Sequence, residues 1–212
     1  MRGIEGALSK KGFKVVQDLS SGANRSVFSV EHKGKRSIVK VPQVKRPLCE
    51  DHFTISSIDL GLRSSHNVRE ANFLRAMKGH PMVPELYGEF KMPILPYLNW
   101  MELRTQGVAK FVWMNGITAI HTQMLPGRKL RKGERITDAT AQQKLIDFVK
   151  DSYAADYFNH DLKRPDNYVV DDQGTARIVD FGTVVEIGED CPSRFREWLQ
   201  NRAIGEMKYY LF

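Results

Sequence analysis

The stretch 159–183 constrains this chain most, because it places acidic residues at both ends of a predicted β-hairpin. Its β-prone runs 168–170 and 176–179 flank a turn signal, Asp-Asp-Gln-Gly. A hairpin of this size brings its two ends together, so three oxygen-bearing side chains are expected to converge there: Asp161, Asn167 and Asp180. Oxygen ligands suit Mg²⁺ and phosphate chemistry better than a soft metal. The stretch therefore predicts a small polar site for a magnesium ion and a phosphate group.

The order of residues in this stretch resembles the catalytic loop and metal-binding motif of the protein-kinase superfamily, HRDLKxxN followed by DFG. Here DLK begins at Asp161, Asn167 matches the metal-binding Asn, and DFG begins at Asp180. The resemblance implies that Asp161 orients or deprotonates an acceptor hydroxyl and that Lys163 steadies the transferring phosphoryl group. It also implies that Asn167 and Asp180 hold Mg²⁺ beside ATP.

The catalytic-loop motif departs from the family pattern in two ways. Asn159 stands at the His position of HRD and His160 at the Arg position, which argues against control by a phosphorylated activation loop. The run from Asp161 to Asn167 is also one residue longer than DLKPEN. Either a local bulge absorbs this residue, or Asp166 and Asn167 exchange roles.

The N-terminal region alternates as a three-stranded meander over 13–41. It resembles the family's glycine-rich loop and the strand that follows with the phosphate-binding lysine. By that alignment the three glycine positions hold Ser20, Gly22 and Arg25, so one glycine of three is kept. The same alignment makes Val27 the adenine-facing valine and Lys40 the phosphate-binding lysine. Ile38 takes the place of the usual small alanine, which is expected to tighten the nucleotide pocket.

The next segments continue the resemblance. Residues 42–67 read as an inserted surface loop, and apolar spacing predicts a helix over 67–77 that ends near Gly79. On this helix, the resemblance implies that Glu70 pairs with Lys40. A hairpin over 111–125 follows, in which Thr122 would line the adenine pocket. Three residues of the hinge would offer backbone hydrogen bonds to the base: Gln123, Met124 and Leu125.

Two further helices are predicted from apolar periodicity. The first covers 137–157 and leads directly into the catalytic loop. The second covers 193–207 and is expected to turn five residues inward: Phe195, Trp198, Leu199, Ala203 and Ile204.

Composition limits the classes of partner and compartment. The 212 residues are 42% hydrophobic and 27% charged, with a net charge of +7. The basic residues are scattered, which favours a solvated surface and argues against a nucleic-acid partner. No apolar run reaches transmembrane length, and the start lacks a signal peptide. Together with two unpaired-looking cysteines, this predicts a cytoplasmic protein, or one delivered into a host cell if it is a bacterial effector.

The combined expectation is an α+β chain with a two-lobed protein-kinase-like fold and a truncated C-terminal lobe. Residues 1–125 would form a sheet-rich nucleotide-binding lobe and 126–212 a mostly helical catalytic lobe. Few residues follow Gly182 and no APE motif occurs, which resembles RIO-type or small bacterial effector kinases. The expected activity is ATP- and Mg²⁺-dependent phosphotransfer, as a Ser/Thr kinase acting on a protein, with an activating protein partner left open. A small-molecule or glycan (sugar or lipopolysaccharide) kinase and a nucleotide-binding pseudokinase that serves as an interaction module remain alternatives.

Overall fold

The chain is an α+β protein whose contacts divide it into two compact units. The computed structural model describes residues 2–19, 25–42, 53–92, 117–159 and 161–212. The first unit comprises Met1–Ala71 and Leu86–Met124, and the second comprises Asn72–Glu85 and Leu125–Phe212. The sequence-based division placed everything before residue 126 in the first lobe. In the structure, however, residues 72–85 pack with the second unit.

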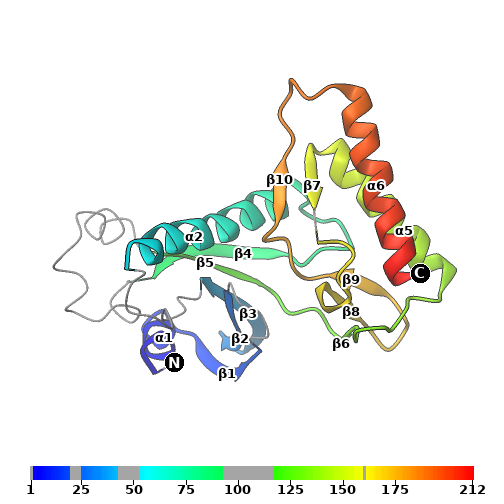
Figure 1. The fold of residues 1–212 in the computed structure, drawn as a ribbon. Helices are drawn as coiled ribbons and strands as arrows, with labels where there is room; N and C mark the ends of the chain where they lie inside the picture. The colour runs from blue at the N-terminus through cyan, green and yellow to red at the C-terminus, as the bar shows by residue number, and fades with distance from the viewer. Residues whose placement is uncertain (1, 20–24, 43–52, 93–116, 160) are drawn as a thin grey trace. The chain divides into compact units, whose positions relative to one another are not determined.

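The first unit is built on an antiparallel sheet (Figure 1). Its described strands, in spatial order, are β1 (Lys14–Asp18), β2 (Arg25–His32), β3 (Lys35–Pro42), β5 (Ile117–Gln123) and β4 (Leu86–Met92). The turn between β2 and β3 has positive φ at both Lys33 (50°) and Gly34 (75°), as a type I′ hairpin turn requires. The predicted meander of three strands is confirmed by the β1–β2 and β2–β3 pairings.

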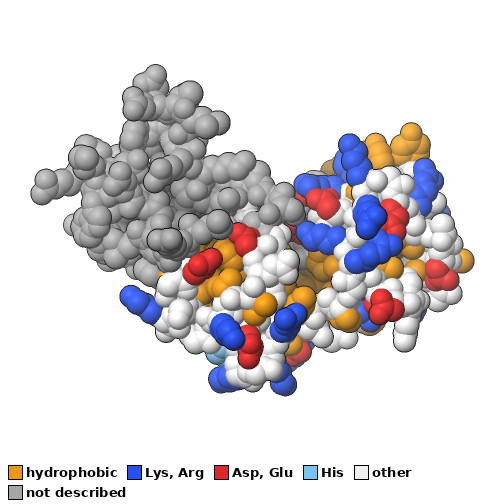
Figure 2. Space-filling view, turned by 90° about the horizontal axis from the view of Figure 1, so that it is seen from below, with side chains coloured by type: hydrophobic (Ala, Val, Ile, Leu, Met, Phe, Trp, Pro, Cys, Tyr) orange, Lys and Arg blue, Asp and Glu red, His pale blue; other side chains and the backbone are white. Residues whose placement is uncertain are grey.

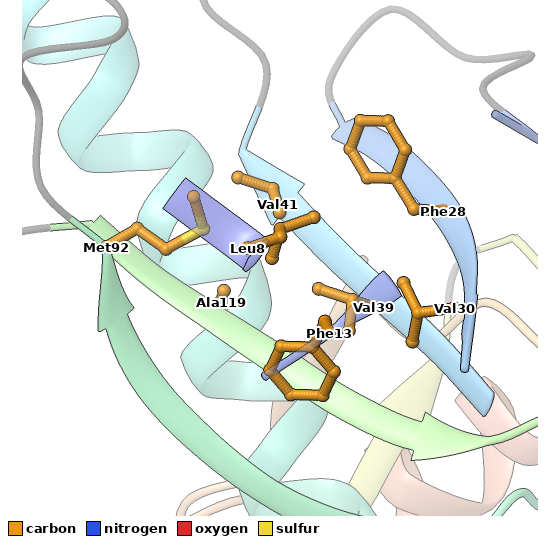
Figure 3. Close-up of a cluster of buried hydrophobic side chains, with 8 residues drawn as sticks. All are labelled: Leu8, Phe13, Phe28, Val30, Val39, Val41, Met92 and Ala119. Atoms are coloured by element: carbon orange, nitrogen blue, oxygen red, sulfur yellow. The ribbon is translucent and has the colours of Figure 1, made fainter. Parts of the chain in front are cut away.

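One face of this sheet carries the apolar core of the first unit (Figure 3). Helix α1 (Arg2–Ser9) covers this face and inserts Leu8, which is fully buried, among the strand side chains. The cluster comprises Leu8, Phe13, Phe28, Val30, Val39, Val41, Met92 and Ala119. Helix α1 was not predicted from the sequence, because eight residues are too few to show a periodic pattern.

Helix α2 (Phe53–Ala76) is longer than predicted. The prediction of a surface loop is wrong for 53–66, while 43–52 lie outside the described residues. Serines and Gly61 weaken the apolar periodicity of that stretch, but it holds no proline, so nothing in it interrupts the helical hydrogen bonds. The predicted end is confirmed, since α2 stops at Ala76 and Gly79 takes a positive φ of 83°.

The second unit combines two helices with short strands. Asp138 caps helix α5 (Ala139–Ala154), because its Oδ1 accepts the Ala141 N–H at 2.6 Å. The predicted hairpin is confirmed: β8 (Tyr168–Val170) pairs with β9 (Ala176–Ile178). The remaining elements are β6 (Arg128–Lys129), which pairs with β8, a 3₁₀ turn η1 (Pro165–Asn167), and the paired strands β7 (Tyr157–Asn159) and β10 (Val184–Glu186).

A glycine is required just before β6. Gly127 has φ of 116°, and a Cβ there would lie 2.3 Å from the Val170 carbonyl oxygen on β8. Real Cβ atoms do not approach an oxygen so closely, and this φ is one that L-residues rarely adopt. The crossing of the two segments therefore depends on the absence of a side chain at residue 127.

The last helix, α6 (Ser193–Leu211), packs against α5 (Figure 1). Ala203 is buried as predicted, together with Met207 and Leu211. The prediction that Phe195 and Trp198 point inward is wrong, because each is 50% exposed. With about 3.6 residues per turn, Trp198 lies on the opposite side of the helix from Met207. The two outward rings stack on each other instead, with centroids 5.5 Å apart.

Candidate functional site

The sheet of the first unit has a second face, opposite the apolar core, and it carries Lys40. Side chains alternate along a strand, and directly opposed residues on neighbouring strands share a face. Val27 lies opposite Lys40, and Ile38 lies opposite Thr122. The residues that the resemblance assigned to an adenine pocket therefore share the face of Lys40: Val27, Ile38 and Thr122.

The structure does not test the predicted nucleotide-binding role of three other residues, Gly22, Gln123 and Leu125. Gly22 lies outside the described residues. Gln123 ends β5 opposite Ser37, and Leu125 is half-buried at the start of a segment of the second unit. The role of their backbone groups at a base stays a prediction.

Lys40 and Glu70 form a buried ion pair. Lys40 Nζ lies 2.5 Å from Glu70 Oε1, with the side chains 6% and 0% exposed. Strand β3 supplies the lysine and helix α2 the glutamate, as the resemblance implied. Such a pair holds an ammonium group in one place, which suits a phosphate anchor.

Arg25 is a second cation on the same carboxylate. Its Nη1 donates to Glu70 Oε2 and, at 3.3 Å, to Asn67 Oδ1, and the side chain is 7% exposed. The sequence alignment identifies Arg25 only as a residue that replaces the third glycine of the glycine-rich loop. Its spacing from Val27 was a usable signal, because two residues along a strand return a side chain to the same face.

Asn67 fastens helix α2 to the sheet. Its Nδ2 donates to the carbonyl oxygens of Lys40 (3.0 Å) on β3 and Thr118 (2.8 Å) on β5. Asn67 is fully buried and lies one helical turn before Glu70. Buried amides need such partners, so these bonds fix the position of the helix on this face.

In the second unit, buried neighbours hold the backbone of the predicted catalytic loop. The Tyr168 hydroxyl donates to the Leu162 carbonyl at 2.5 Å, and Tyr168 is fully buried. Burial raises the pKa of this hydroxyl, so it stays protonated and keeps donating. Asn167 Nδ2 donates to the Asp161 carbonyl at 3.1 Å, which draws the two ends of the loop together.

The 3₁₀ turn η1 absorbs the extra residue of the loop. Asp166 turns outward and pairs with Arg164, whose Nη2 lies 2.8 Å from Asp166 Oδ2. Asn167 is 6% exposed and keeps the inward position. Of the two interpretations that the sequence left open, the structure therefore favours the local bulge over an exchange of roles.

Asp180 follows directly from the hairpin. The Val179 N–H donates to the Asn167 carbonyl at 2.9 Å, so residue 180 begins where the loop ends. Asp180 Oδ1 accepts the Gly182 N–H at 3.0 Å. The next side chain, Phe181, is fully buried against Phe73, with ring centroids 4.7 Å apart. This packing anchors the predicted metal-binding segment.

Nearby acidic residues raise the pKa of Arg164. Its pKa is raised first by the hydrogen bond to Asp166, and further by the attraction of Asp166, Asp161 and Asp180. The backbone bonds described above bring residues 161, 167 and 179 close together, which supports one polar site in the second unit.

Asn159, which the resemblance aligns with the HRD histidine, links the predicted catalytic loop to the segment after DFG through hydrogen bonds. It is 4% exposed, and its Oδ1 accepts the Asp161 N–H at 3.0 Å and the Thr183 hydroxyl at 3.1 Å. It links the start of the loop to the residue after DFG. His160 lies outside the described residues.

Lys163 has an acidic partner on the last helix. Its Nζ lies 3.5 Å from Glu206 Oε2, and the lysine is 45% exposed. Arg202 Nε donates to the other oxygen of Glu206 at 3.1 Å. Whether Lys163 steadies a phosphoryl group remains a prediction.

Basic and acidic side chains are mixed on the surface. Figure 2 shows Lys and Arg side chains spread over the described region of the visible face, with Asp and Glu side chains among them. Within the described ranges, no three His, Cys, Asp or Glu side chains gather as a metal-binding group, and no helix is both long and apolar enough to cross a membrane.

No protein-family model matches the chain. A search of curated proteins likewise finds no match.

Proposed function

We propose that this chain is a Mg²⁺- and ATP-dependent phosphotransferase with a two-lobed kinase-like fold, and that its acceptor is a Ser/Thr hydroxyl of a protein. The observation that carries the proposal is the buried Lys40–Glu70 pair. The two residues are far apart in the sequence and were paired on the strength of the kinase resemblance alone. A buried lysine and carboxylate cost desolvation free energy that apolar side chains would not, and such groups are often retained at functional sites, which supports a phosphate-binding role.

The second unit contributes the acidic part of the proposed reaction. Asn167 donates through Nδ2 to a backbone carbonyl, which leaves its Oδ1 as an acceptor. That oxygen and the carboxylate of Asp180 are the ligand types that Mg²⁺ takes. The donor set therefore fits this ion, and when bound the ion would neutralise charge on the phosphates of ATP.

Each remaining residue has one task in the proposed reaction. Asp161 accepts the proton of the acceptor hydroxyl or orients it for attack in line with the bond to the leaving group. Lys40, held by Glu70, anchors the phosphates through its ammonium group. Tyr168 and Asn159 keep the loop backbone in place, so that Asp161 does not have to be ordered when the substrate binds.

The test is transfer of radiolabelled γ-phosphate from ATP in the presence of Mg²⁺. The native chain is compared with Lys40→Met and Asp180→Asn, using a generic protein, and separately sugars, as acceptors. Asp172→Asn is the matched control, because it makes the same chemical change at an exposed turn of the hairpin. We expect transfer to protein by the native chain and the control, and its loss in both site variants.

Other outcomes would redirect the proposal. Transfer to sugar alone would replace the protein acceptor with a glycan. Binding of Mg²⁺ and ATP without transfer to either acceptor would point to a pseudokinase. If the native chain does not bind the nucleotide, the phosphotransferase proposal is wrong.

A further inference from the structure

We propose that Arg25 is a positioning residue: it holds Glu70, and through Glu70 it sets Lys40, so that the phosphate-anchoring pair is assembled within the first unit itself. The phosphate-anchoring part of this inference rests on the proposed function. The arrangement of Arg25, Glu70, Lys40 and Asn67, which we call the Arg25 cluster, does not depend on it.

The carboxylate of Glu70 is held at two points. Oε1 accepts from Lys40 Nζ, and Oε2 accepts from Arg25 Nη1. A carboxylate held through one oxygen can rotate about its last torsion, whereas bonds to both oxygens fix the plane of the group. Arg25 therefore helps to set the position of the Lys40 ammonium through the carboxylate that the two cations share.

Burial disfavours any conformation in which Glu70 loses one of its two cations. The side chains of Arg25, Glu70 and Lys40 are 7%, 0% and 6% exposed. In such a place a carboxylate that loses one of its cations is not compensated by water. Arginine suits the task because its planar guanidinium presents several donors in fixed directions, and lysine does not reproduce this geometry.

The cluster also fixes the helix that carries Glu70. Asn67 donates to carbonyl oxygens of two strands, β3 and β5, and Arg25 donates to Asn67 Oδ1. A displacement of α2 from the sheet would break these bonds and both ion pairs of Glu70 together. The pair of Lys40 and Glu70 is thus held by bonds made within the first unit.

The first experiment compares Arg25→Met and Arg25→Lys with the native chain, and uses Arg36→Met as the matched control at an exposed position of β3. We expect Arg25→Met to raise the KM for ATP about tenfold, because a hydrogen bond to a charged group is worth about that factor. The KM for the acceptor should not change. Arg25→Lys should recover part of the loss. Simple loss of folded protein would lower kcat and leave both KM values unchanged, and this result, or an unchanged KM for ATP, would overturn the proposal.

The second experiment does not require activity. Hydrogen–deuterium exchange is followed by mass spectrometry without nucleotide, comparing peptides from 65–76 of α2 with peptides from α6. In Arg25→Met, we expect faster exchange in α2 and unchanged exchange in α6. Equal α2 exchange in Arg25→Met and Arg36→Met would overturn the role of Arg25 even if the native chain transfers phosphate. Faster α2 exchange in a chain that does not bind ATP would instead retain the cluster and reject the proposed function.

Discussion

The two units hold their proposed functional residues in opposite ways. In the first unit the charged side chains themselves are buried, and they contact one another across a strand and a helix. In the second unit Asp161 and Asp180 are only half-buried, and fully buried neighbours such as Tyr168 and Phe181 fix their backbone. In the first unit the same residues therefore serve stability and the proposed function, whereas in the second unit different residues do.

This difference says which substitutions can separate function from folding. A change to a buried ion removes a partner from another buried ion, so it is felt in the free energy of unfolding. A change to the half-buried carboxylate of Asp161 leaves the bonds of its neighbours intact, because they use the backbone groups of this residue. The predictions below are ordered by their expected effect on that free energy.

Glu70→Ala should have the largest effect. It removes the carboxylate shared by Lys40 and Arg25, and loss of one partner of a buried ion pair costs about 3–5 kcal/mol. Urea unfolding followed by far-UV circular dichroism measures the change.

The matched control for Glu70→Ala replaces the whole charged group. In the triple variant Arg25→Met, Lys40→Met, Glu70→Leu no cation is left without its carboxylate, and we expect most of the lost stability to return. A triple variant as unstable as Glu70→Ala would show that the cost comes from packing and not from the charges.

Asn159→Ala should destabilise the second unit by about 2 kcal/mol, because the Asp161 N–H and the Thr183 hydroxyl both lose their acceptor. The same unfolding measurement applies. Asn201→Ala, at an exposed position of α6, is the control and should change stability by less than about 0.5 kcal/mol. Equal changes in unfolding free energy for the two variants would mean that the hydrogen bonds of Asn159 do not stabilise the second unit.

His121 should make the first unit sensitive to acid. Burial, together with the smaller effect of the nearby His32, lowers the pKa of His121 from 6.5 to about 4. Above pH 6.5 the ring is neutral in both states, so stability is unaffected there. As the pH falls from 6.5 towards 4, the unfolded chain takes up the proton more readily, and stability is lost.

The check is the thermal midpoint of the native chain and of His121→Gln across this pH range. The variant should lose less stability between pH 6.5 and 4, since glutamine does not titrate. Parallel curves for the two proteins would contradict a role of His121 in this loss.

Asp161→Asn should have the smallest effect on stability and a large effect on activity. The contacts that hold residue 161 use its backbone N–H and carbonyl, so the substitution preserves them. We expect a change in unfolding free energy within about 0.5 kcal/mol and loss of phosphate transfer. Destabilisation as large as that of Asn159→Ala would break the comparison between the two units.

Local pattern was enough to predict several parts of the fold. The β8–β9 hairpin follows from two β-prone runs around a turn signal, and the end of α2 near Gly79 follows from short-range chemistry. The pairing of Lys40 with Glu70, which the structure shows, was implied only by the resemblance to the kinase family.

Other parts depend on contacts between distant segments, which the pattern does not contain. Arg25 gains its partners from a helix 42 to 45 residues away in the sequence, so it could be taken for a defective glycine position. Phe195 and Trp198 are apolar at helical spacing, yet the burial of Met207 and Leu211 sets the rotation of α6 and turns them outward. The choice between Asp166 and Asn167 required the geometry of a 3₁₀ turn.

The crossing at Gly127 has a consequence for tracing descent. A residue with any side chain there would collide with the carbonyl of Val170, so homologues that retain this path of the chain must retain the glycine together with the register of β6 on β8. The glycine and the strand register together identify such homologues without reference to the predicted catalytic motifs. A distant sequence that shares DLK and DFG but lacks this glycine would have to enter its second unit by a different route.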